Sequence, residues 1–459
     1  MCALHRTKIG ISIQGTSIYL DERTLMLSES VVKKWKISTN QSLMLQHGSF
    51  KQEVKIVPFA RTHILRMNPA LAARLGLHQG ATLCLQYRAS RQTLRLGPLI
   101  GVMVSRVYAS SVDKPFGAMT AFCNEMTEAC RQFGAQIFFV TPDELQADPQ
   151  SINGHVYSHD QWSKKSFPVP NVIYNRLTSR KYESLANVQN FMKDVKARGT
   201  QIFNEKYLDK TEVFDALSKD PSIHIYLPES YLFKNYQMLK SMSSRYSTLF
   251  LKPITGSLGK GIIRIEKHPG GSYNCQFTNA GGVRRKEFDS LPALFTALSG
   301  KLKSQRYQLQ QGVELITAEG RPVDFRALVQ KGAQGVWTIT SVVARIASTQ
   351  QFVSNIARGG SLGNVKDTLG KSSLNALQRV SVYGKLRKAS LDIAASIEAQ
   401  IPFHFGELGI DLAVDSQGRV WLLEVNSKPS KDDNTPLSEQ KIRPSVKQIV
   451  QYARFLAKY

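Results

Sequence analysis

An internal repeat constrains the first hundred residues more than any other feature of the chain. Six apolar positions of the first copy recur forty residues later, so that Leu27, Val31, Trp35, Ile37, Leu43 and Leu45 correspond to Met67, Leu71, Leu75, Leu77, Leu83 and Leu85. Each copy predicts a short helix (28–35 and 68–75), a turn, and a strand with alternating apolar residues. Two copies are too few for a solenoid, so the repeat predicts a small pseudo-symmetric β-barrel over residues 1–96.

The repeat region also carries an excess of positive charge. Residues 1–106 hold 15 Lys and Arg but only four acidic residues, and the whole chain has 60 Lys and Arg against 35 Asp and Glu, a net charge of +25. A field of this sign favours phosphorylated or polyanionic partners. Two interpretations stay open: a well-solvated basic surface, and a docking face for nucleic acid or another acidic polymer.

Cysteine usage and hydropathy indicate a reducing compartment. The cysteines form no C-x-x-C pair and have no histidine cluster beside them, which argues against a zinc site or a disulfide framework. They are Cys2, Cys84, Cys123, Cys130 and Cys275. No apolar run approaches the roughly 20 residues of a membrane span, and the first ten residues lack the apolar core of a signal peptide. We therefore expect a cytoplasmic protein without a membrane span.

Residues 97–207 alternate apolar strands with amphipathic helices, after a break at Gly97 and Pro98. The predicted elements are, in order, a strand at 99–105, a helix at 119–133, a strand at 135–140, a polar loop, a strand that leads to Arg176 and Arg180, a helix at 185–197 and a strand at 200–204. This order predicts an α/β layer. The two arginines either bind an acidic substrate or are ordinary surface residues.

A glycine-rich loop follows a predicted strand that ends at Lys252. Gly256, Gly259 and Gly261 leave a loop whose amides can approach a phosphate closely. Glycines that serve only to turn a hairpin are the alternative. The loop lacks the Walker sequence and does not lead into a helix, which argues against a P-loop NTPase. Lys210 lies near the start of a predicted helix upstream of this loop.

Residues 406–429 predict a β-hairpin, with two apolar strands around the turn signal D-S-Q-G. We expect Val414 to pair with Arg419, which would place Asp411 opposite Leu422 on the second strand.

Three oxygen-bearing side chains would then share one face of this hairpin, namely Asp411, Glu424 and Asn426. Ligands that are all oxygen suit Mg²⁺ or Mn²⁺, and Mg²⁺ normally binds together with substrate phosphates. The alternative is a hairpin whose acids face only solvent.

These motifs together give the chain a resemblance to a known superfamily. In chain order they are Lys210 in LDK, Lys252 in LKP, the loop GSLGKG, the segment QQGVEL, Asp324 and Arg326 in VDFR, Arg345 with FVSNIARGG, and the ending with Asp411, Glu424 and Asn426. From about Leu99 to its end the chain resembles the ATP-grasp superfamily, and most closely the YheC/YheD-type proteins associated with the endospore coat. The basic repeat region also resembles the front part of those proteins.

The resemblance implies an α/β (α+β) fold in three domains. A small pseudo-symmetric β-barrel at 1–96 would precede a Rossmann-like pre-ATP-grasp domain at 97–207. An ATP-grasp domain at 208–459 would follow, with two α+β subdomains that hold ATP between them.

The resemblance also implies roles for individual residues. The residues that would contact ATP are Lys210, Lys252, Gly256, Ser257, Gly259, Lys260, Gly261, Gln310, Gln311, Val313, Glu314 and Asp324. Those that would hold Mg²⁺ or Mn²⁺ are Asp411, Glu424 and Asn426. The catalytic residues would be Arg345, Asn355 and Arg326, and the candidate substrate ligands are Arg176, Arg180, Arg358, Gly359 and Gly360. The segment from Gln310 to Glu314 would be the hinge between the subdomains.

The activity that the resemblance implies is ATP-dependent ligation of a carboxylate to an amine or thiol through an acyl phosphate, linked to sporulation, with an unknown acceptor. The absence of a Ser/His/Asp or Cys/His constellation agrees with a reaction that needs no protein nucleophile. The alternatives are a non-catalytic ATP-binding structural protein of the spore coat and a polyanion binder that uses the barrel. The implied partners are spore-coat proteins, with nucleic acid less favoured, and the implied location is the cytoplasm at the forespore or spore coat.

Overall fold

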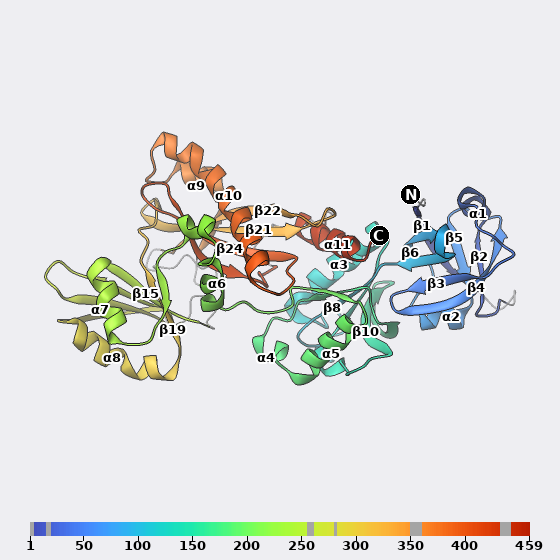
Figure 1. Ribbon diagram of the computed structural model, residues 1–459, viewed down its shortest axis with the longest axis horizontal. Coiled ribbons are helices and arrows are strands. Elements are labelled where there is room, and N and C mark those ends of the chain that lie inside the picture. Colours follow the sequence, from blue (N-terminus) through green and yellow to red (C-terminus); the bar gives the residue numbers. More distant parts are fainter. Residues whose placement is uncertain (1–3, 15–19, 255–260, 280–281, 349–359, 432–441) are drawn as a thin grey trace.

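The computed structural model describes residues 4–14, 20–254, 261–279, 282–348, 360–431 and 442–459. The chain forms a closed barrel at one end, a central α/β layer, and two lobes at the other end (Figure 1). This arrangement confirms the mixed α/β fold class that the sequence predicts.

The N-terminal barrel is a closed sheet in the order β1-β5-β2-β4-β3-β7-β6. Its elements are β1 (Leu4–Ile13), β2 (Thr24–Ser28), α1 (Glu29–Trp35), β3 (Leu43–His47), β4 (Phe50–Phe59), β5 (Ile64–Met67), α2 (Pro69–Arg74), β6 (Thr82–Arg88) and β7 (Thr93–Gly97). The pairings occur twice: β1 runs parallel to β5 as β4 does to β2, and β1 is antiparallel to β6 as β4 is to β3. The predicted pseudo-symmetry is therefore confirmed.

The repeated apolar residues form the core of this barrel. All twelve repeat positions are buried, and several of them, including Leu27 and its counterpart Met67, are completely inaccessible. Burial of apolar surface contributes about 25 cal/mol per Å². Both copies of the repeat therefore supply apolar side chains to the same core.

The central layer is a sheet in the order β11-β10-β9-β8-β12-β13. Its elements are β8 (Leu99–Met103), α3 (Thr120–Phe133), β9 (Gln136–Val140), β10 (Ser151–Ser158), β11 (Gln161–Pro168), β12 (Val172–Asn175), α4 (Arg180–Glu183), α5 (Ala186–Ala197) and β13 (Gln201–Phe203). The strands β9, β8, β12 and β13 are parallel. Helix α3 packs on one face together with α11 (Pro444–Leu456), whereas α5 packs on the other.

The polar loop predicted after β9 is wrong, because the chain there forms the antiparallel hairpin β10–β11. Its inward residues, among them Ile152 and Val156, alternate with outward polar ones. Gly154 interrupts the apolar side of this pattern, and a Cβ atom there would meet Phe138 of the neighbouring β9. The alternation is therefore present in the sequence but too weak to predict a strand.

The first lobe is a sheet in the order β14-β19-β15-β16-β17-β18, with α7 and α8 packed on one face. Its elements are β14 (Ser230–Leu232), α7 (Tyr236–Arg245), β15 (Thr248–Pro253), β16 (Ile263–Lys267), β17 (Tyr273–Asn279), β18 (Gly282–Phe288), α8 (Leu291–Ser304) and β19 (Tyr307–Gln311). One face of this sheet is apolar and packs on the helices. The opposite face carries Lys252 and Gln310 and is directed toward the second lobe.

The second lobe is a sheet in the order β23-β22-β21-β24-β25. Its elements are α6 (Lys210–Leu217), β20 (Thr317–Ala318), β21 (Arg321–Lys331), β22 (Trp337–Ile346), β23 (Ser361–Gly363), α9 (Val365–Gly370), α10 (Ala376–Gln400), β24 (Glu407–Val414) and β25 (Val420–Asn426). The long helix α10 and the helix α6 cover one face of this sheet with a single apolar core.

The predicted hairpin exists as β24 and β25, but its register differs by one residue. Val414 pairs with Val420, and the predicted pairing of Val414 with Arg419 is wrong. The Asp415 carboxylate accepts a hydrogen bond from the backbone N–H of Arg419 at 2.9 Å, which keeps Arg419 in the turn. The turn therefore contains one residue more than the sequence pattern suggested.

A bulge changes the register again near the charged residues. Leu412 faces Leu422, the register shifts between Asp411 and Leu412, and Asp411 then lies directly opposite Glu424. The predicted pairing of Asp411 with Leu422 is therefore wrong. The prediction that Asp411 and Glu424 share one face of the hairpin is confirmed, because the two residues are cross-strand neighbours.

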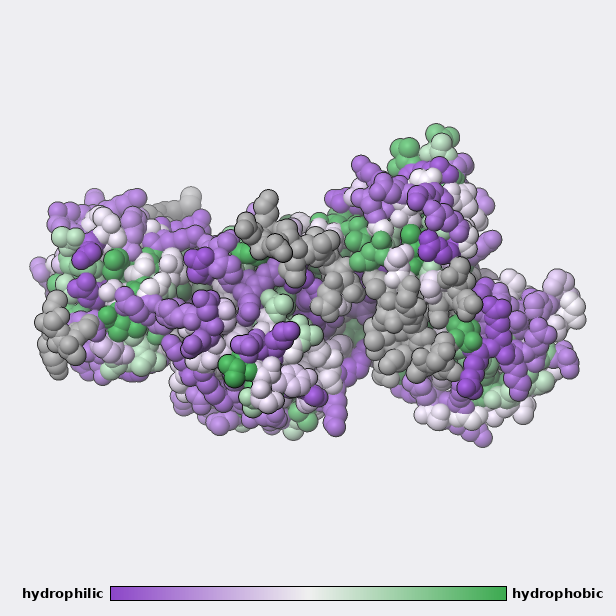
Figure 2. All heavy atoms as spheres, turned by 180° about the vertical axis from the view of Figure 1, so that it is seen from behind, coloured by the Kyte–Doolittle hydropathy of each residue, from purple (hydrophilic) through white to green (hydrophobic). Residues whose placement is uncertain are grey.

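The face of the molecule seen in Figure 2 is mainly hydrophilic among the coloured residues, with an apolar spot at the tip that α9 and the start of α10 form. Leu377 and Val380 of α10 lie at this tip and are 85% and 83% exposed. In the ranges that the structure describes, no helix is long and apolar enough to cross a bilayer.

Candidate functional site

Charged residues occupy the face of the second-lobe sheet that lies away from α10. On β21, Val323, Phe325 and Ala327 are buried against the helical layer, so Asp324 and Arg326 must point to the opposite side. Sequence alternation alone therefore directs these two charges away from the core.

Neighbouring strands add opposite charges beside them. Arg326 lies opposite Asp411 of β24, and Asp324 lies opposite Arg345 of β22. Arg326 donates to both oxygens of Asp411, with Nη2 at 2.9 Å from Oδ2. Arg345 bridges the two acids, with Nε at 2.5 Å from Asp324 and Nη2 at 3.1 Å from Asp411. These four side chains form the arginine–aspartate network.

Ion pairing in the arginine–aspartate network offsets the burial of two of its members, Asp411 and Arg345. Burial by itself would raise the pKa of Asp411, but Arg326 and Arg345 outweigh it and hold this pKa below its ordinary value. Burial opposes the charge of Arg345 as well, and Asp411 and Asp324 raise its pKa above the ordinary value. The pKa shifts of Asp411 and Arg345 therefore both favour the charged forms.

The first lobe contributes a buried ammonium group on its facing side. Lys252 of β15 donates to the side-chain oxygen of Gln310 on β19, whose amide donates to Ser230 at 2.8 Å. Burial lowers the pKa of Lys252 to about 8. A lysine with this environment is only partly charged above neutral pH unless an anion binds beside it.

Charges of the second lobe act on Lys252. The acids Glu424, Asp411 and Asp324 raise its pKa, whereas Lys210 lowers it. Lys210, the first residue of α6, forms an ion pair of 3.2 Å with Glu424 of β25. The predicted residues from α6, β15, β21 and the hairpin are therefore close together in one site.

The segment between the two sheets has the position expected of a hinge. Gln311 ends β19, and Leu315 forms a bridge with Asp415 in the other lobe, so Val313 and Glu314 connect the lobes. Gly312 lies close to Thr248, where a Cβ atom would approach the threonine side chain to 2.6 Å. Any residue with a Cβ atom would clash with Thr248 here, so the backbone requires glycine at position 312.

The sequence of this chain matches a known family over the region that forms the site. The model of the family described as YheC/D like ATP-grasp matches residues 199–456, which is more than half of the chain. The chain belongs to the YheC/D-like ATP-grasp family. The resemblance inferred from the ordered motifs is therefore confirmed.

Curated relatives of the family come from Bacillus subtilis (strain 168). The endospore coat-associated protein YheD is 28% identical over 340 residues, which cover 74% of this chain and 74% of YheD. The endospore coat-associated protein YheC is 24% identical over 318 residues, which cover 67% of this chain and 84% of YheC. Among solved structures, D-alanyl-alanine synthetase A from Vibrio cholerae O1 biovar eltor str. N16961 is similar, with 10% identity, a TM-score of 0.45, and coverage of 79% of this chain and 99% of that one.

Several residues predicted for the YheC/D-like site lie outside the described residues. They are Gly256, Ser257, Gly259 and Lys260 of the glycine loop, and Asn355, Arg358 and Gly359 of the later loop. Gly261 and Gly360 are the first described residues after these segments. Gly261 has a φ of +73° and donates to the carbonyl of Thr278 at 3.2 Å, so the end of the glycine loop is anchored on β17.

The donor set proposed for a divalent cation is only partly available in this arrangement. Both oxygens of Asp411 are paired with guanidinium groups, whereas Glu424 is more exposed and contacts Lys210. Asn426 ends β25, two residues from Glu424 and on the same face. No group of three or more His, Cys, Asp and Glu that could hold a metal ion occurs within the described ranges. The oxygen donors at Glu424 and Asn426 suit Mg²⁺, which also needs phosphate oxygens.

The two arginines that follow β12 have different surroundings. Arg176 is 4% exposed and donates to the carbonyl of Pro429 at 2.7 Å, so it links the central layer to the chain after β25. Arg180 donates to the carbonyl of Leu208 at 2.7 Å, and its guanidinium lies 4.9 Å from the centre of the Tyr207 ring. Both lie beside the YheC/D-like site, and Arg180 is the more accessible of the two.

Asn204 supports the charged hairpin, and sequence reasoning did not single it out. Its Oδ1 accepts from the backbone N–H groups of Gly406 and Glu407 at 3.0 and 3.2 Å. Its Nδ2 donates to the carbonyls of Glu407, at 2.9 Å, and Ser427. Asn204 has a φ of +55°, a backbone conformation that Asn adopts more readily than most residues. The residue type at this position is therefore the only hint of its role in the sequence.

Replacing Asn204 with Ala is expected to loosen both ends of the hairpin. The buried backbone groups would lose their partners, at a total cost of about 3 kcal/mol. Hydrogen exchange of the β24 and β25 amides should become at least about tenfold faster, while exchange in the barrel stays unchanged. Asn153→Ala, at an exposed position of β10, is the control. Equal exchange in the two variants would contradict this role of Asn204.

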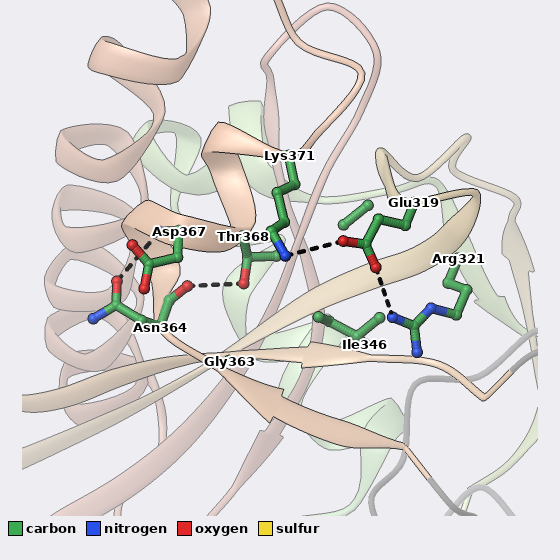
Figure 3. A pocket seen from close by; sticks show the side chains of 9 residues that line it. Glu319, Arg321, Ile346, Gly363, Asn364, Asp367, Thr368 and Lys371 are labelled. Atoms are coloured by element: carbon green, nitrogen blue, oxygen red, sulfur yellow. Dashed lines mark hydrogen bonds and ion pairs between the residues drawn. The ribbon is translucent and has the colours of Figure 1, made fainter.

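A hollow at the outer edge of the second lobe does not belong to the site. It has a volume of about 230 Å³ and lies between the β20–β21 turn, β23 and α9 (Figure 3). Glu319 accepts from Lys371 at 3.0 Å and from Arg321 at 3.3 Å, so the charges that line it neutralise one another. None of the charged residues of the two-lobe site lines this hollow.

Proposed function

We propose that this chain is an ATP-dependent ligase that joins a carboxylate to an amine or thiol through an acyl phosphate. The observation that carries the proposal is the meeting of Lys252 from one lobe with Lys210, Glu424 and the arginine–aspartate network from the other. Such a set can hold a polyphosphate and stabilise charge that develops during phosphoryl transfer.

The nucleotide would bind between the lobes. Lys252 and Lys210 would contact its phosphates, the glycine loop with Gly261 would cover them, and the segment from Gln310 to Glu314 would meet the adenosine. An orphaned polar atom supports this position: the side-chain oxygen of Gln308, which lies opposite Lys252 in the sheet, is buried without a hydrogen-bond partner among the described residues. A donor group on the ligand would satisfy it.

Glu424 and Asn426 would hold Mg²⁺, together with Asp411 if its arginine contacts rearrange. The ion supplies neutralisation of the phosphate charge when it is bound. Lys210, which lies beside Glu424, would hold a phosphate oxygen through a charge-assisted hydrogen bond.

The chemistry follows from positioned charge and needs no nucleophile from the protein. In the proposed reaction a substrate carboxylate oxygen attacks the γ-phosphate of ATP, the bond to ADP breaks, and an acyl phosphate forms. An amine or thiol then attacks the acyl carbon, the bond from that carbon to the phosphate oxygen breaks, and the proton of the nucleophile passes to the departing phosphate. Arg345 would stabilise the transferring phosphoryl group, since Asp324 and Asp411 already fix its orientation. Asn355 and Arg326 would assist it.

The biological setting is proposed from the relatives. YheD and YheC are named endospore coat-associated proteins, and we extend this association to the present chain. A non-catalytic ATP-binding role in the coat is the second candidate. The pairing of Asp411 with two arginines favours it, because these contacts compete with a metal ion for the same oxygens.

Glu424→Gln separates the two candidates. For the ligase, phosphate release from ATP in the presence of pooled amino acids, dicarboxylates and polyamines is expected to fall by about 100-fold or more. Binding of the fluorescent nucleotide mant-ATP should persist, because Lys252 and Gln310 are untouched. Glu53→Gln, on the exposed side of the barrel, is the control. Wild-type protein that binds mant-ATP but releases no phosphate with any pool would refute the ligase.

A further inference from the structure

The central sheet contains a topological switch point that faces the charged site. From β8 the chain passes through α3 to β9, and from β12 it passes through α5 to β13. Helices α3 and α5 pack on opposite faces of the sheet, so the chain leaves the adjacent strands β8 and β12 in opposite directions. In parallel sheets, ligands bind outside the carboxyl ends of strands at such a point.

Polar side chains join the two strand ends at this point. After β8, the hydroxyl of Ser105 lies 2.7 Å from the hydroxyl of Thr178, which follows β12, and it accepts a hydrogen bond from the Thr178 backbone N–H at 2.7 Å. Arg106 donates to the hydroxyl of Tyr182 at 3.0 Å, across the same junction. The two loops thus form one connected surface, which we name the switch-point edge and define by Ser105, Arg106, Thr178, Arg180 and Tyr182.

Two guanidinium groups on the switch-point edge have aromatic neighbours. Arg106 lies 5.8 and 5.9 Å from the ring centres of Tyr108 and Tyr182, and Arg180 lies 4.9 Å from that of Tyr207. Within the ranges that the structure describes, neither arginine forms a salt bridge. Aromatic contacts orient a guanidinium plane while its N–H groups stay available for a carboxylate.

Glu183 of α4, an acid close to this edge, is already neutralised. Glu183 forms an ion pair with Lys428 and also accepts hydrogen bonds from Asn175 at 3.1 Å and from the backbone N–H of Tyr207 at 2.6 Å. Arg176, buried below the edge, donates to the carbonyl of Pro429 through its Nη2. The switch-point edge therefore has a surplus of positive charge.

The switch-point edge adjoins the proposed nucleotide site. Arg180 donates to the carbonyl of Leu208, two residues before Lys210, which pairs with Glu424. A molecule held at Arg180 could thus extend toward the phosphates.

We propose that the switch-point edge binds the substrate that is ligated, and that this substrate is an acidic molecule with at least two carboxylates. One carboxylate would be held by Arg106 and one by Arg180, while the hydroxyls of Ser105 and Thr178 supply further hydrogen bonds. The inference rests on the proposed ligase and names its substrate class. Its chemistry fits either a dicarboxylic amino acid or an acidic peptide.

The test uses fluorescein-labelled pentaglutamate and the full chain, with binding measured by fluorescence anisotropy at about 150 mM salt, where general charge attraction is screened. Wild-type protein is expected to bind the peptide. Arg106→Gln and Arg180→Gln should each weaken binding by about tenfold or more, which corresponds to the loss of one charge-assisted contact. Arg61→Gln, an exposed arginine of the barrel, is the matched control and should bind like wild type.

Unlabelled competitors identify the source of the carboxylates. Displacement by free glutamate as effective as that by pentaglutamate would identify a small dicarboxylic amino acid, and displacement by the peptide alone would identify an acidic peptide. No binding to wild type, or equal weakening in Arg61→Gln, would overturn the inference.

Parallel titrations with mant-ATP keep this inference apart from the proposed function. Arg106→Gln and Arg180→Gln should bind mant-ATP like wild type, while Lys252→Met should bind mant-ATP more weakly and pentaglutamate like wild type. If the wild-type protein binds mant-ATP but not the peptide, only the substrate assignment is refuted. If it binds the peptide but not mant-ATP, the proposed nucleotide site is refuted.

Discussion

Replacing Asp411 with Asn is expected to lower the free energy of unfolding of the second lobe by about 3–5 kcal/mol at pH 7. Asp411 is 6% exposed and neutralises Arg326 and Arg345 together. Among the described residues, the amide would leave the Arg326 guanidinium without a carboxylate partner and Arg345 with Asp324 alone. Breaking a buried ion pair in this way costs far more than the pair contributes, since the remaining charge stays desolvated.

The measurement can be confined to the lobe. Trp337 and Trp421 lie in β22 and β25, and the other two tryptophans of the chain, Trp35 and Trp162, lie elsewhere. Urea unfolding followed by fluorescence in a Trp35→Phe and Trp162→Phe background therefore reports the lobe. Asp143→Asn, at an exposed position, is the control and should change the transition by less than about 0.5 kcal/mol.

The pH dependence of this effect has a defined sign. Because the pKa of Asp411 is lowered in the folded chain, its contribution to stability is present above the ordinary carboxyl pKa of about 4 and is lost as pH falls through the lower, folded value. The difference between wild type and Asp411→Asn should thus be constant from pH 5 to 8 and shrink below about pH 4. A constant difference down to pH 2 would contradict the ionised network.

The parts of this fold that sequence reasoning predicted are those encoded by local patterns. The barrel follows from apolar positions such as Leu27 and Met67, which recur because both copies fill one core. The ATP-grasp lobes follow from the order of short motifs, in which Lys252 ends a strand and Asp411 occupies a hairpin. Each of these signals depends on spacing along the chain and on no long-range partner.

The register of the hairpin shows where such reasoning stops. Alternation placed Asp411 and Glu424 on one face, and a bulge beside Leu412 made them direct neighbours. A bulge is a one-residue change that no apolar pattern records.

The partners of the charged residues were also beyond reach from the sequence. Asp411 was expected to hold a metal ion, and the structure pairs it with Arg326 and Arg345, which come from strands 85 and 66 residues away in the chain. Asn204 was missed for the same reason, since its role depends on two strand ends more than 200 residues later. The residue type at one position does not reveal which distant backbone N–H and C=O groups its side chain hydrogen-bonds.

Replacing Lys252 with Met is expected to weaken mant-ATP binding by roughly 10- to 150-fold without loss of stability. The binding loss follows from removal of a charge-assisted contact to phosphate, worth about 1.5–3 kcal/mol. Stability should be equal or higher, because burial lowers the pKa of Lys252 to about 8 and the folded chain therefore disfavours its charged form. Methionine has a similar length and no charge to desolvate. Lys240→Met, on the exposed side of α7, is the control for both measurements.

The pH profile distinguishes this role from a packing effect. The folded pKa of Lys252, about 8, lies below the ordinary lysine value of about 10.4. The unfolded chain therefore binds the proton more tightly between these values, and wild-type stability should rise with pH in that window relative to Lys252→Met. Over the same range mant-ATP affinity of wild type should fall, because the neutral amine attracts no phosphate, while the low affinity of Lys252→Met stays constant. Parallel profiles for the two proteins would show that the ammonium charge of Lys252 does not bind the nucleotide.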